Sequence, residues 1–593
     1  MAILVANIGT SDISVKIGDY YIPIGFDRSE PNIVEPEEDS PEAAVWVKNR
    51  RREIQSLYRE LGFQDSGDPK WSVPFRDLTQ RLLAAYTTEP DIWHDRILPG
   101  RLWGVIEAAL QFPLTEVHLF ITNQLDEEAD KRLSDTVYLF ELIQQWLKTR
   151  LEREGRPLLA ICGVAIEFKA IDQDKLLSRY YDFFKDRPAN EELLLSIKGG
   201  TPQMQTALRV QANAVGSQYQ ISLEPRLVIS DVLHGKPSKC DRISLWRYTR
   251  IQKYQAVERL LKRWDFAGAI ALLEDWQEVL KFLKTHQVVD LDSLKQSSDR
   301  VEQMIQLTTF AKHQFNLDAG AAKRLSEKYR HLKEVQTLTS QYKQQNSPLT
   351  TLNLFTQCRI FWELDQIANF LPRLGSCCEF ALETIIRRSL SGQPIVDSQW
   401  RLDVDRAKRL WDGRFWQDFA QRERSWFDPK DNRSKDNTNF INFERNLRDG
   451  KKAPYKLTGR YSKRNLAEAL FSQAQQPQNL QEWEAVHQFL TQLDFWVALR
   501  NDLIHMAKGV SREAMVTLYQ EETSRHKAVI RGLPNTKICP PEEILPTLSQ
   551  IVVSPLIGLE KPLIQKFTSL TDDRYLYSAV TQSIQSLCAQ DLL

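Results

Sequence analysis

The sequence lacks the marks of several protein classes. Only 7 of its 593 residues are cysteine and none form a CxxC pair, which argues against a zinc site and suits a reducing cytoplasm. Its 78 basic and 78 acidic residues cancel, so no global field draws nucleic acid to it. No apolar stretch is long enough to span a membrane, and the start MAILVANIGTSD has no basic leader. We therefore expect a cytoplasmic protein without membrane association, in which any polyanion binds at a local patch.

Two common nucleotide-binding motifs are also missing. The chain has no GxGxxG segment. The segment HGKPSK around Lys236 is not a Walker A loop, because Ser230 and Pro237 occupy the positions that require Gly and Ser or Thr. NAD binding and ATP hydrolysis are therefore poor expectations.

The amino-terminal part has the pattern of a mainly parallel sheet. Short apolar runs predict strands at residues 3–8, 117–122, 164–170 and 193–197, with helices such as 101–111 and 136–152 between them. Strands that are apolar throughout and alternate with helices predict a Rossmann-like α/β domain. Residues 13–26 look like a hairpin insertion, and residues 29–43, rich in Glu and Pro, like a mobile surface loop.

A helical period replaces this pattern after about Trp246, so we expect an all-α second half. The chain exceeds the roughly 250 to 300 residues at which a single core stops growing, which favours several domains. The polar run 341–348 is the best linker candidate. We expect a ligand-binding α/β domain at residues 1–245, a helical connector at 246–348 and a helical domain at 349–593.

The ends of the predicted strands suggest a ligand pocket. In doubly wound folds ligands lie beyond the carboxyl ends of the strands. Strand one is followed by Gly9, Thr10 and Ser11, and strand four by KGGTP, which places Lys198, Gly199, Gly200 and Thr201 at the same edge. Thr201 is a natural N-cap and Pro202 a natural first helical residue, so free N–H groups would face a phosphate or nucleotide there.

Each of these loops also has an ordinary structural explanation. Any βα turn favours Gly, and Thr-Pro is a common helix start. At a third strand end, Gln124 could read a base edge or be a polar loop residue, and Asp135 is expected to cap the following helix.

Near the carboxyl end, RNDLIH lies inside an apolar helix that begins around Leu493. RNA can be cut by its own 2'-hydroxyl if a base removes the proton, a cation steadies the phosphorane and an acid serves the leaving oxygen. His505 can be that acid or base, because an unperturbed imidazole titrates near 6.5. Arg500 suits the phosphate oxygens, and Asn501 could orient either group. No metal is needed for this chemistry, and a metal-independent endoribonuclease is the leading hypothesis.

Arg500 and His505 point in directions roughly 140° apart on an ideal helix. Two copies related by a dyad would concentrate these groups, which favours a homodimeric site. Structural ion pairing of Arg500 remains the alternative.

A basic and aromatic stretch lies upstream of this motif. Basic residues interleaved with tyrosines suit single-stranded RNA through phosphate attraction and base stacking, although a solvated charged loop is the simpler explanation. The residues are Lys451, Lys452, Tyr455, Lys456, Arg460, Tyr461, Lys463 and Arg464.

These features coincide in one known architecture. The chain resembles the CARF and HEPN ribonucleases, the ancillary nucleases of type III CRISPR antiviral immunity that cyclic oligoadenylate activates. The resemblance rests on the NIGTSD loop, the TNQ and DT elements, the KGGTP loop and RNDLIH, whereas the middle segment matches only in being helical.

The resemblance implies an N-terminal CARF domain that dimerises and binds cyclic tetra-adenylate or cyclic hexa-adenylate across the dyad. It also implies a C-terminal HEPN domain in which Arg500, Asn501 and His505 fall on the family's Arg, polar and His positions. The implied products of single-stranded RNA cleavage are a 2',3'-cyclic phosphate and a 5'-hydroxyl, with no metal or other cofactor.

Some members of that family also degrade their activator, and Ser11 and Lys198 are candidates for that step. Two alternatives stay open. One is a non-enzymatic nucleotide sensor with a helical dimerisation domain, and the other is a toxin-type HEPN ribonuclease restrained by a protein partner.

Overall fold

The computed structural model divides the chain into two compact units. One contains Met1–Tyr254, Glu274–Val301 and Asp591–Leu593, and the other contains Gln255–Leu273 and Glu302–Gln590. The residues that the structure describes are 2–25, 33–125, 127–329, 347–390, 395–428, 433–451, 454–457, 459–473, 477–506, 511–526, 538–560 and 576–592.

The first unit is built on a seven-stranded sheet in the order β10-β9-β8-β1-β6-β7, with β4 paired to β9. The strands are β1 (Ala2–Asn7), β4 (Ile33–Val34), β6 (Leu114–Thr122), β7 (Ala160–Ile166), β8 (Glu192–Ser196), β9 (Gln220–Val228) and β10 (Lys239–Ile243). All neighbours are parallel except β10, which runs antiparallel to β9. The Rossmann-like α/β fold predicted from the sequence is therefore confirmed, although the prediction lacked β4, β9 and β10.

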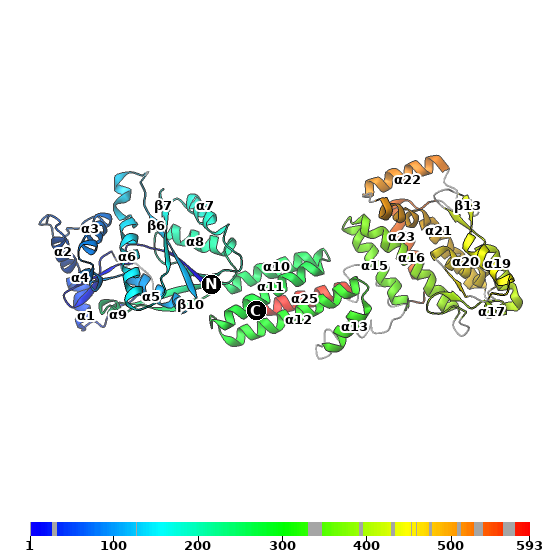
Figure 1. Cartoon of the computed structure of the whole chain (residues 1–593), viewed down its shortest axis with the longest axis horizontal. Helices are drawn as coiled ribbons and strands as arrows, with labels where there is room; N and C mark the ends of the chain where they lie inside the picture. Colours follow the sequence, from blue (N-terminus) through cyan, green and yellow to red (C-terminus); the bar gives the residue numbers. More distant parts are fainter. Residues whose placement is uncertain are drawn as a thin grey trace. The chain divides into compact units, whose positions relative to one another are not determined.

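Helices cover both faces of this sheet (Figure 1). Helices α7 (Gln173–Phe184) and α8 (Pro202–Ala214) pack against Ile3, Val5 and Phe120 on one face. Helices α5 (Gly100–Ala109) and α6 (Val137–Arg153) contact the strands from the other. The chain runs from β1 outward through β6 and β7 and then returns to β8 on the opposite side of β1. The strand order thus reverses between β1 and β8, which is where such sheets bind ligands.

The expected hairpin after β1 is present. Strand β2 (Ser14–Ile17) pairs with β3 (Tyr20–Pro23), and β5 (Ile97–Leu98) extends this small sheet. The hairpin is followed by β4, by an irregular and largely exposed stretch at 35–40 and then by a run of helices, so the expected surface loop at 29–43 is interrupted in its described part only by β4 and α1. These helices are α1 (Pro41–Ala43), the π-helix Ala44–Asn49, α2 (Arg50–Glu60), α3 (Phe75–Thr88) and α4 (Pro90–His94). Ile33 and Val34 pair with Leu227 and Val228 of β9, which attaches the start of this segment to the main sheet.

The change to helix at Trp246 is confirmed. The connector region contains α10 (Trp246–Lys262), α11 (Phe266–Thr285), α12 (Leu291–Phe315) and α13 (Ala319–Lys328), and the last described helix is α25 (Leu576–Leu592). The carboxylate of Asp591, at the end of α25, is buried. It accepts hydrogen bonds from Tyr254 and Ser297 at 2.7 and 2.8 Å and lies 3.1–3.2 Å from Arg300 and Arg250. Most of the expected linker, 341–346, lies outside the described residues.

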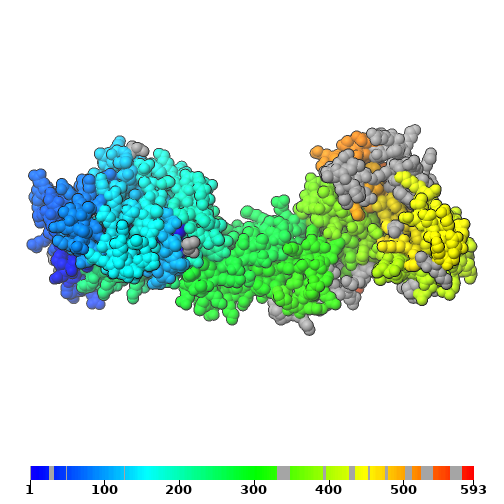
Figure 2. Space-filling view, viewed as in Figure 1, coloured from blue at the N-terminus to red at the C-terminus, as the bar shows by residue number. Residues whose placement is uncertain are grey.

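The second unit is mainly helical, with a core of apolar side chains such as Phe370, Leu382 and Trp496. Its longer helices are α15 (Ser347–Glu363), α16 (Ile367–Ser389), α18 (Arg414–Glu423), α19 (Thr438–Arg448), α20 (Gly459–Ser472), α21 (Pro477–Met506), α22 (Arg512–His526) and α23 (Ile544–Val553). Figure 2 shows one outer face of the molecule with its side chains, coloured along the sequence as in Figure 1.

The expectation of an all-α second half needs one correction. Short strands pair as β11 (Arg401–Leu402) with β14 (Tyr455–Lys456) and β12 (Ser425–Asp428) with β13 (Arg433–Asp436). These strands are too short to show a two-residue period in sequence. Within the described ranges, no helix is both long and apolar enough to cross a bilayer.

Candidate functional site

The loops after β1 and β8 meet at the point where the strand order reverses. A methyl group added to Gly9 would lie 2.9 Å from the backbone N of Gly200, and one added to Gly199 would lie 2.3 Å from the carbonyl oxygen of Asn7. Gly199 and Gly200 have φ values of +116° and +65°, which L side chains rarely adopt. The structure therefore brings Gly9, Gly199 and Gly200 together as expected. We call the junction of these two loops, formed by Gly9, Gly199, Gly200 and Thr201, the strand-end crevice.

Thr201 is the N-cap of α8, as the sequence predicted. Its Oγ1 accepts a hydrogen bond from the N–H of Met204 at 3.2 Å and donates one to the carbonyl of Ala170, and Pro202 follows as the first helical residue. The first turn of this 13-residue helix thus faces the strand-end crevice with its positive end.

Gln124 is held inside the protein. Its Nε2 donates to Asp135 at 2.9 Å and to the carbonyl of Lys131, while its Oε1 accepts from the N–H of Ala170 at 3.0 Å. Both polar atoms of the amide are thus used in joining the loops that follow β6 and β7. This arrangement supports the structural alternative, and base reading by Gln124 stays a prediction.

Asp135 does not cap α6, which corrects that expectation. The N-cap is Thr136, and the buried Asp135 carboxylate instead forms an ion pair with Arg76 at 2.7 Å and accepts from the N–H of Gln124. Thr136 and Thr122 exchange backbone-to-hydroxyl hydrogen bonds of 2.9 and 3.0 Å. Asp135 pairs with Arg76, which is distant in sequence, instead of capping the helix. The spacing of residues around Asp135 gives no sign of this pairing.

The other expected ligand-binding side chains differ in their surroundings. Lys198 extends toward β9, where its Nζ lies 3.4 Å from the carbonyl oxygen of Pro225 and 3.9 Å from Glu224. Ser11 is buried and Thr10 is half-buried. These two residues form the turn closed by the hydrogen bond from the N–H of Asp12 to the carbonyl of Gly9.

Sequence reasoning missed a buried ion pair beneath this loop. Both nitrogens Nε and Nη2 of Arg101 lie 3.1 Å from the carboxylate of Asp12, which also accepts from the N–H of Gly9 at 2.8 Å. Arg101 and Asp12 are 3% and 1% exposed. The same Arg101 Nη2 lies 3.0 Å from the position of a methyl group on Gly199. Both residues lie in segments that the sequence had singled out, Asp12 in the NIGTSD loop and Arg101 at the start of an expected helix. Their opposite charges were the available sign of a pair.

The RNDLIH segment lies at the end of α21, which begins at Pro477, much earlier than expected. Arg500 is partly buried, and its Nε is buried with no hydrogen-bond partner among the residues that the structure describes. No acidic side chain among those that the structure describes pairs with it. Asn501 and His505 belong to the same helix, and their side chains lie outside the described residues.

Two other arginines near this segment are paired. Asp494, on α21, accepts from Nη2 of Arg464 at 2.6 and 2.7 Å and from Nε of Arg460 at 3.1 Å. Arg460 also donates to the hydroxyl of Tyr461, and burial, reinforced by the charge of Asp494, raises the pKa of Tyr461 to about 12. We call Arg460, Arg464 and Asp494 the arginine cluster. One carboxylate serves two guanidinium groups, so the cluster carries a positive excess.

The basic stretch is not a loop that presents cations to RNA, which corrects that hypothesis for its described residues from Arg460 onward. Arg460, Lys463 and Arg464 lie on α20, and Lys463 is buried 2.5 Å from both Glu379 and Glu383. Tyr455 is buried as well, where its hydroxyl donates to Glu423 at 2.7 Å. The i, i+3, i+4 spacing of the three cations was the signal for one helix face.

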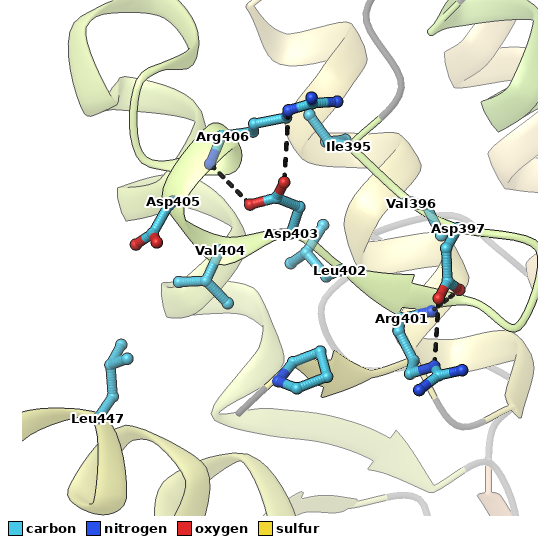
Figure 3. Close-up of a pocket in the computed structure, with 11 residues that line it drawn as sticks. Ile395, Val396, Asp397, Arg401, Leu402, Asp403, Val404, Asp405, Arg406 and Leu447 are labelled. Carbon is cyan, nitrogen blue, oxygen red and sulfur yellow. Dashed lines mark hydrogen bonds and ion pairs between the residues drawn. The ribbon is translucent and has the colours of Figure 1, made fainter. Parts of the chain in front are cut away.

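A cavity of about 490 Å³ in the second unit contains none of the expected site residues. It is lined by apolar side chains such as Leu402 and Val404 and by charged groups on β11 and α17 (Val404–Ala407). Figure 3 shows that Asp403 is bound to Arg406 and Asp397 to Arg401 at its rim. Within the described ranges, no group of three or more His, Cys, Asp and Glu residues could hold a metal ion.

No protein-family model and no curated protein matches this chain significantly. Among solved structures, similarity is found to Enterococcus italicus Csm6 bound to cyclic hexa-2'-fluoro-hexa-dAMP. The two are 13% identical, the TM-score is 0.45, and the match covers 82% of this chain and 95% of that one. A likeness of this degree assigns no function, and the function proposed below depends on residues of this chain.

Proposed function

We propose that this chain is a metal-independent endoribonuclease that cleaves single-stranded RNA and is activated by cyclic oligoadenylate, as in the CARF and HEPN ribonucleases of type III CRISPR defence that its sequence resembles. The observation that carries the proposal is the guanidinium group of Arg500. It lies five residues before His505 on α21, and no acidic side chain in the described part of the chain neutralises it. The arginine cluster is different, because Asp494 pairs with both of its cations.

The chemistry follows from these groups. The 2'-hydroxyl of RNA loses its proton to a base and attacks the adjacent phosphorus, and the bond to the 5'-oxygen of the next nucleotide breaks as that oxygen takes up a proton. His505 supplies proton transfer, Arg500 binds the phosphate oxygens as negative charge develops, and Asn501 orients them. The products are a 2',3'-cyclic phosphate and a 5'-hydroxyl.

The active form is a homodimer. Arg500 and His505 diverge by roughly 140° around one helix, so a single copy of α21 cannot direct both at one phosphate. A dyad that places two copies side by side supplies Arg500 from both and His505 from both.

The activator, cyclic tetra-adenylate or cyclic hexa-adenylate, binds at the strand-end crevice. The positive end of α8 suits a phosphate-bearing ligand, and Gly9 and Gly199 allow the β1 and β8 loops beside it to approach each other closely. A ligand with two-fold symmetry on the dimer dyad activates by its higher affinity for the active arrangement. Degradation of the activator in the same crevice would require Lys198 to leave its position beside Glu224 and Pro225.

The test is cleavage of a fluorescent single-stranded RNA in EDTA, with cyclic tetra-adenylate, cyclic hexa-adenylate or no ligand. We expect cleavage with one ring only, and loss of at least about 1,000-fold in kcat for His505→Ala and Arg500→Ala. Light scattering of each variant checks that the dimer persists.

Other outcomes would assign the protein differently. Silence with every ring while a ring still binds would identify a sensor without nuclease activity. Cleavage without any ring would indicate a toxin-type ribonuclease, and cleavage restored only by added Mg²⁺ would overturn metal independence.

A further inference from the structure

One glycine of the second unit lies against the guanidinium group of Arg500. Gly375 is a buried residue in the middle of α16. A methyl group added to it would lie 3.0 Å from Nη1 of Arg500, 3.5 Å from Cδ of Arg500 and 3.2 Å from Cγ1 of Val497. The side chain of Arg500 therefore runs across the bare backbone of Gly375.

Glycine is costly at this position. Apart from proline it is the least favourable residue in the interior of a helix, and Gly375 has ordinary helical geometry rather than the positive φ that would require it. Its added methyl group would contact side chains of α21 and no backbone atom among its three nearest neighbours. The space for the Arg500 side chain is therefore the structural reason for glycine at this place.

We propose that Gly375 is a positioning residue for Arg500, and thereby for the scissile phosphate. This inference rests on the proposed function and extends it to a residue on a second helix. The backbone of α16 at Gly375 is a steric limit on how far the guanidinium group can move toward this helix. Among the described residues the buried Nε has no hydrogen-bond partner and no acidic side chain pairs with the guanidinium group, so packing holds this group in the described part of the unit. Such a steric contact restricts the position of the Arg500 cation without neutralising its charge.

The inference predicts a separation of activity from stability. A methyl group 3.0 Å from Nη1 displaces the far end of a flexible side chain by a few tenths of an ångström, which the fold tolerates. Catalysis depends more steeply on position, since a displacement of about 1 Å can cost roughly 100-fold in rate. For Gly375→Ala in the full-length, ring-activated protein we expect kcat to fall roughly 3- to 10-fold with little change in KM. The unfolding midpoint should stay the same or rise, because alanine favours the helix.

A matched control is Gly320→Ala on α13. Gly320 is also helical, and its added methyl group would meet nothing nearer than Nη1 of Arg324 at 3.6 Å. We expect kcat to be unchanged in this variant. An equal loss of kcat in Gly320→Ala and Gly375→Ala would overturn the inference.

A second comparison separates positioning from simple helix packing. Lysine lacks the Nη1 atom, so Arg500→Lys should lower activity by itself and make the protein insensitive to Gly375→Ala. If Gly375→Ala lowers kcat by the same factor with Arg500 in place and in the Arg500→Lys variant, Gly375 acts through the packing of α16 and α21. That result would overturn the proposal.

The contact can also be tested without any cleavage. In the Arg500→Ala protein, Gly375→Ala no longer meets a guanidinium group and should raise the unfolding midpoint by more than it does beside Arg500. Additive shifts would refute the contact. If the unmutated protein cleaves no RNA with either ring, the proposed function fails, and non-additive midpoints would still establish that Gly375 positions Arg500.

Discussion

The strand-end crevice and the region around α20 and α21 differ in the groups that form them. The strand-end crevice consists of backbone, glycines and a helix terminus, and the nearest buried charges, Asp12 and Arg101, neutralise each other. The region around α20 and α21 consists of charged side chains, with two arginines on one aspartate and Arg500 without an acidic partner among the described residues. A backbone site is damaged when an atom is added, whereas a charged site is damaged when a partner is removed. An added methyl group should therefore be the more damaging change at the strand-end crevice, and a deleted carboxylate the more damaging change around α20 and α21.

The largest expected effect is the loss of Asp494. The side chains of Asp494 and Arg464 are only 5% and 9% exposed, so Asp494→Ala leaves a buried guanidinium group without its counter-charge. We expect the second unit to lose about 3–5 kcal/mol of stability. Urea unfolding followed by hydrogen exchange of α20 and α21 peptides measures this loss.

The control for this variant is Asp65→Ala, which removes a carboxylate from an exposed pair with Arg59. Surface ion pairs contribute little because solvent screens their charges, so this change should be nearly silent. Equal effects of the two variants would show that charge pairing does not distinguish the buried region.

Adding a methyl group to Gly9 should be the next largest effect. The atom that it would meet, at 2.9 Å, is the backbone N of Gly200, and backbone cannot move aside as a side chain can. We expect Gly9→Ala to cost the first unit about 1–3 kcal/mol and to weaken ring binding, as measured by calorimetry. Gly320→Ala is again the matched control. Unchanged binding would place the activator outside the strand-end crevice.

These differences also explain which parts of the molecule were predictable. The β1 and β8 loops and the Thr201 cap were predicted because their signals are local, such as Gly-Gly before Thr-Pro. The partners of Lys198, Gln124 and Arg464 were not, because each partner is distant in sequence or competes with equivalent groups. Arg464, for example, pairs with Asp494, 30 residues away.

Missing strands had a similar cause. Strand β9 contains Glu224 and Pro225, which interrupt its apolar run, and Pro is tolerated only where a strand does not need its N–H. The two short sheets of the second unit depend on tertiary contacts that no period reveals. The side chains of Asn501 and His505 are outside the described residues, so their roles stay predictions.

Removal of the Thr201 hydroxyl should have a smaller effect than Gly9→Ala. Thr201→Ala loses the cap on Met204 and the hydrogen bond to Ala170, which we expect to cost about 1–2 kcal/mol. Thr201→Ser keeps the hydroxyl and should restore both stability and ring binding. Failure of Thr201→Ser to restore them would assign the role to the lost methyl group instead.

The smallest expected effect is the pH dependence of the first unit's stability that comes from the buried His94. His94 is buried, stacks on Trp146 at 5.3 Å and has an Nε2 without a hydrogen-bond partner in the described part of the chain. Burial lowers the pKa of His94, and the charge of Arg153 lowers it further. Its folded pKa thus lies below the unfolded value of about 6.5. The stability that neutral His94 contributes to the first unit is therefore fully present above about pH 6.5, and it is lost as the pH falls through the folded pKa.

Hydrogen exchange of α3 and α6 peptides between about pH 7.5 and 5.5, a range that brackets the ordinary histidine pKa, measures this loss, with rates corrected for intrinsic pH dependence. His94→Phe should reduce the pH dependence. Tyr86→Phe removes the same 3.0 Å hydrogen bond between Tyr86 and His94 but keeps the imidazole, so it should retain the dependence. If both variants lose it equally, the hydrogen bond and not the proton is responsible. If His94 alone carries it, the first unit differs from the second in a defined way: its buried histidine must stay neutral for the fold to persist, whereas Arg460 and Arg464 of the arginine cluster must stay charged and paired.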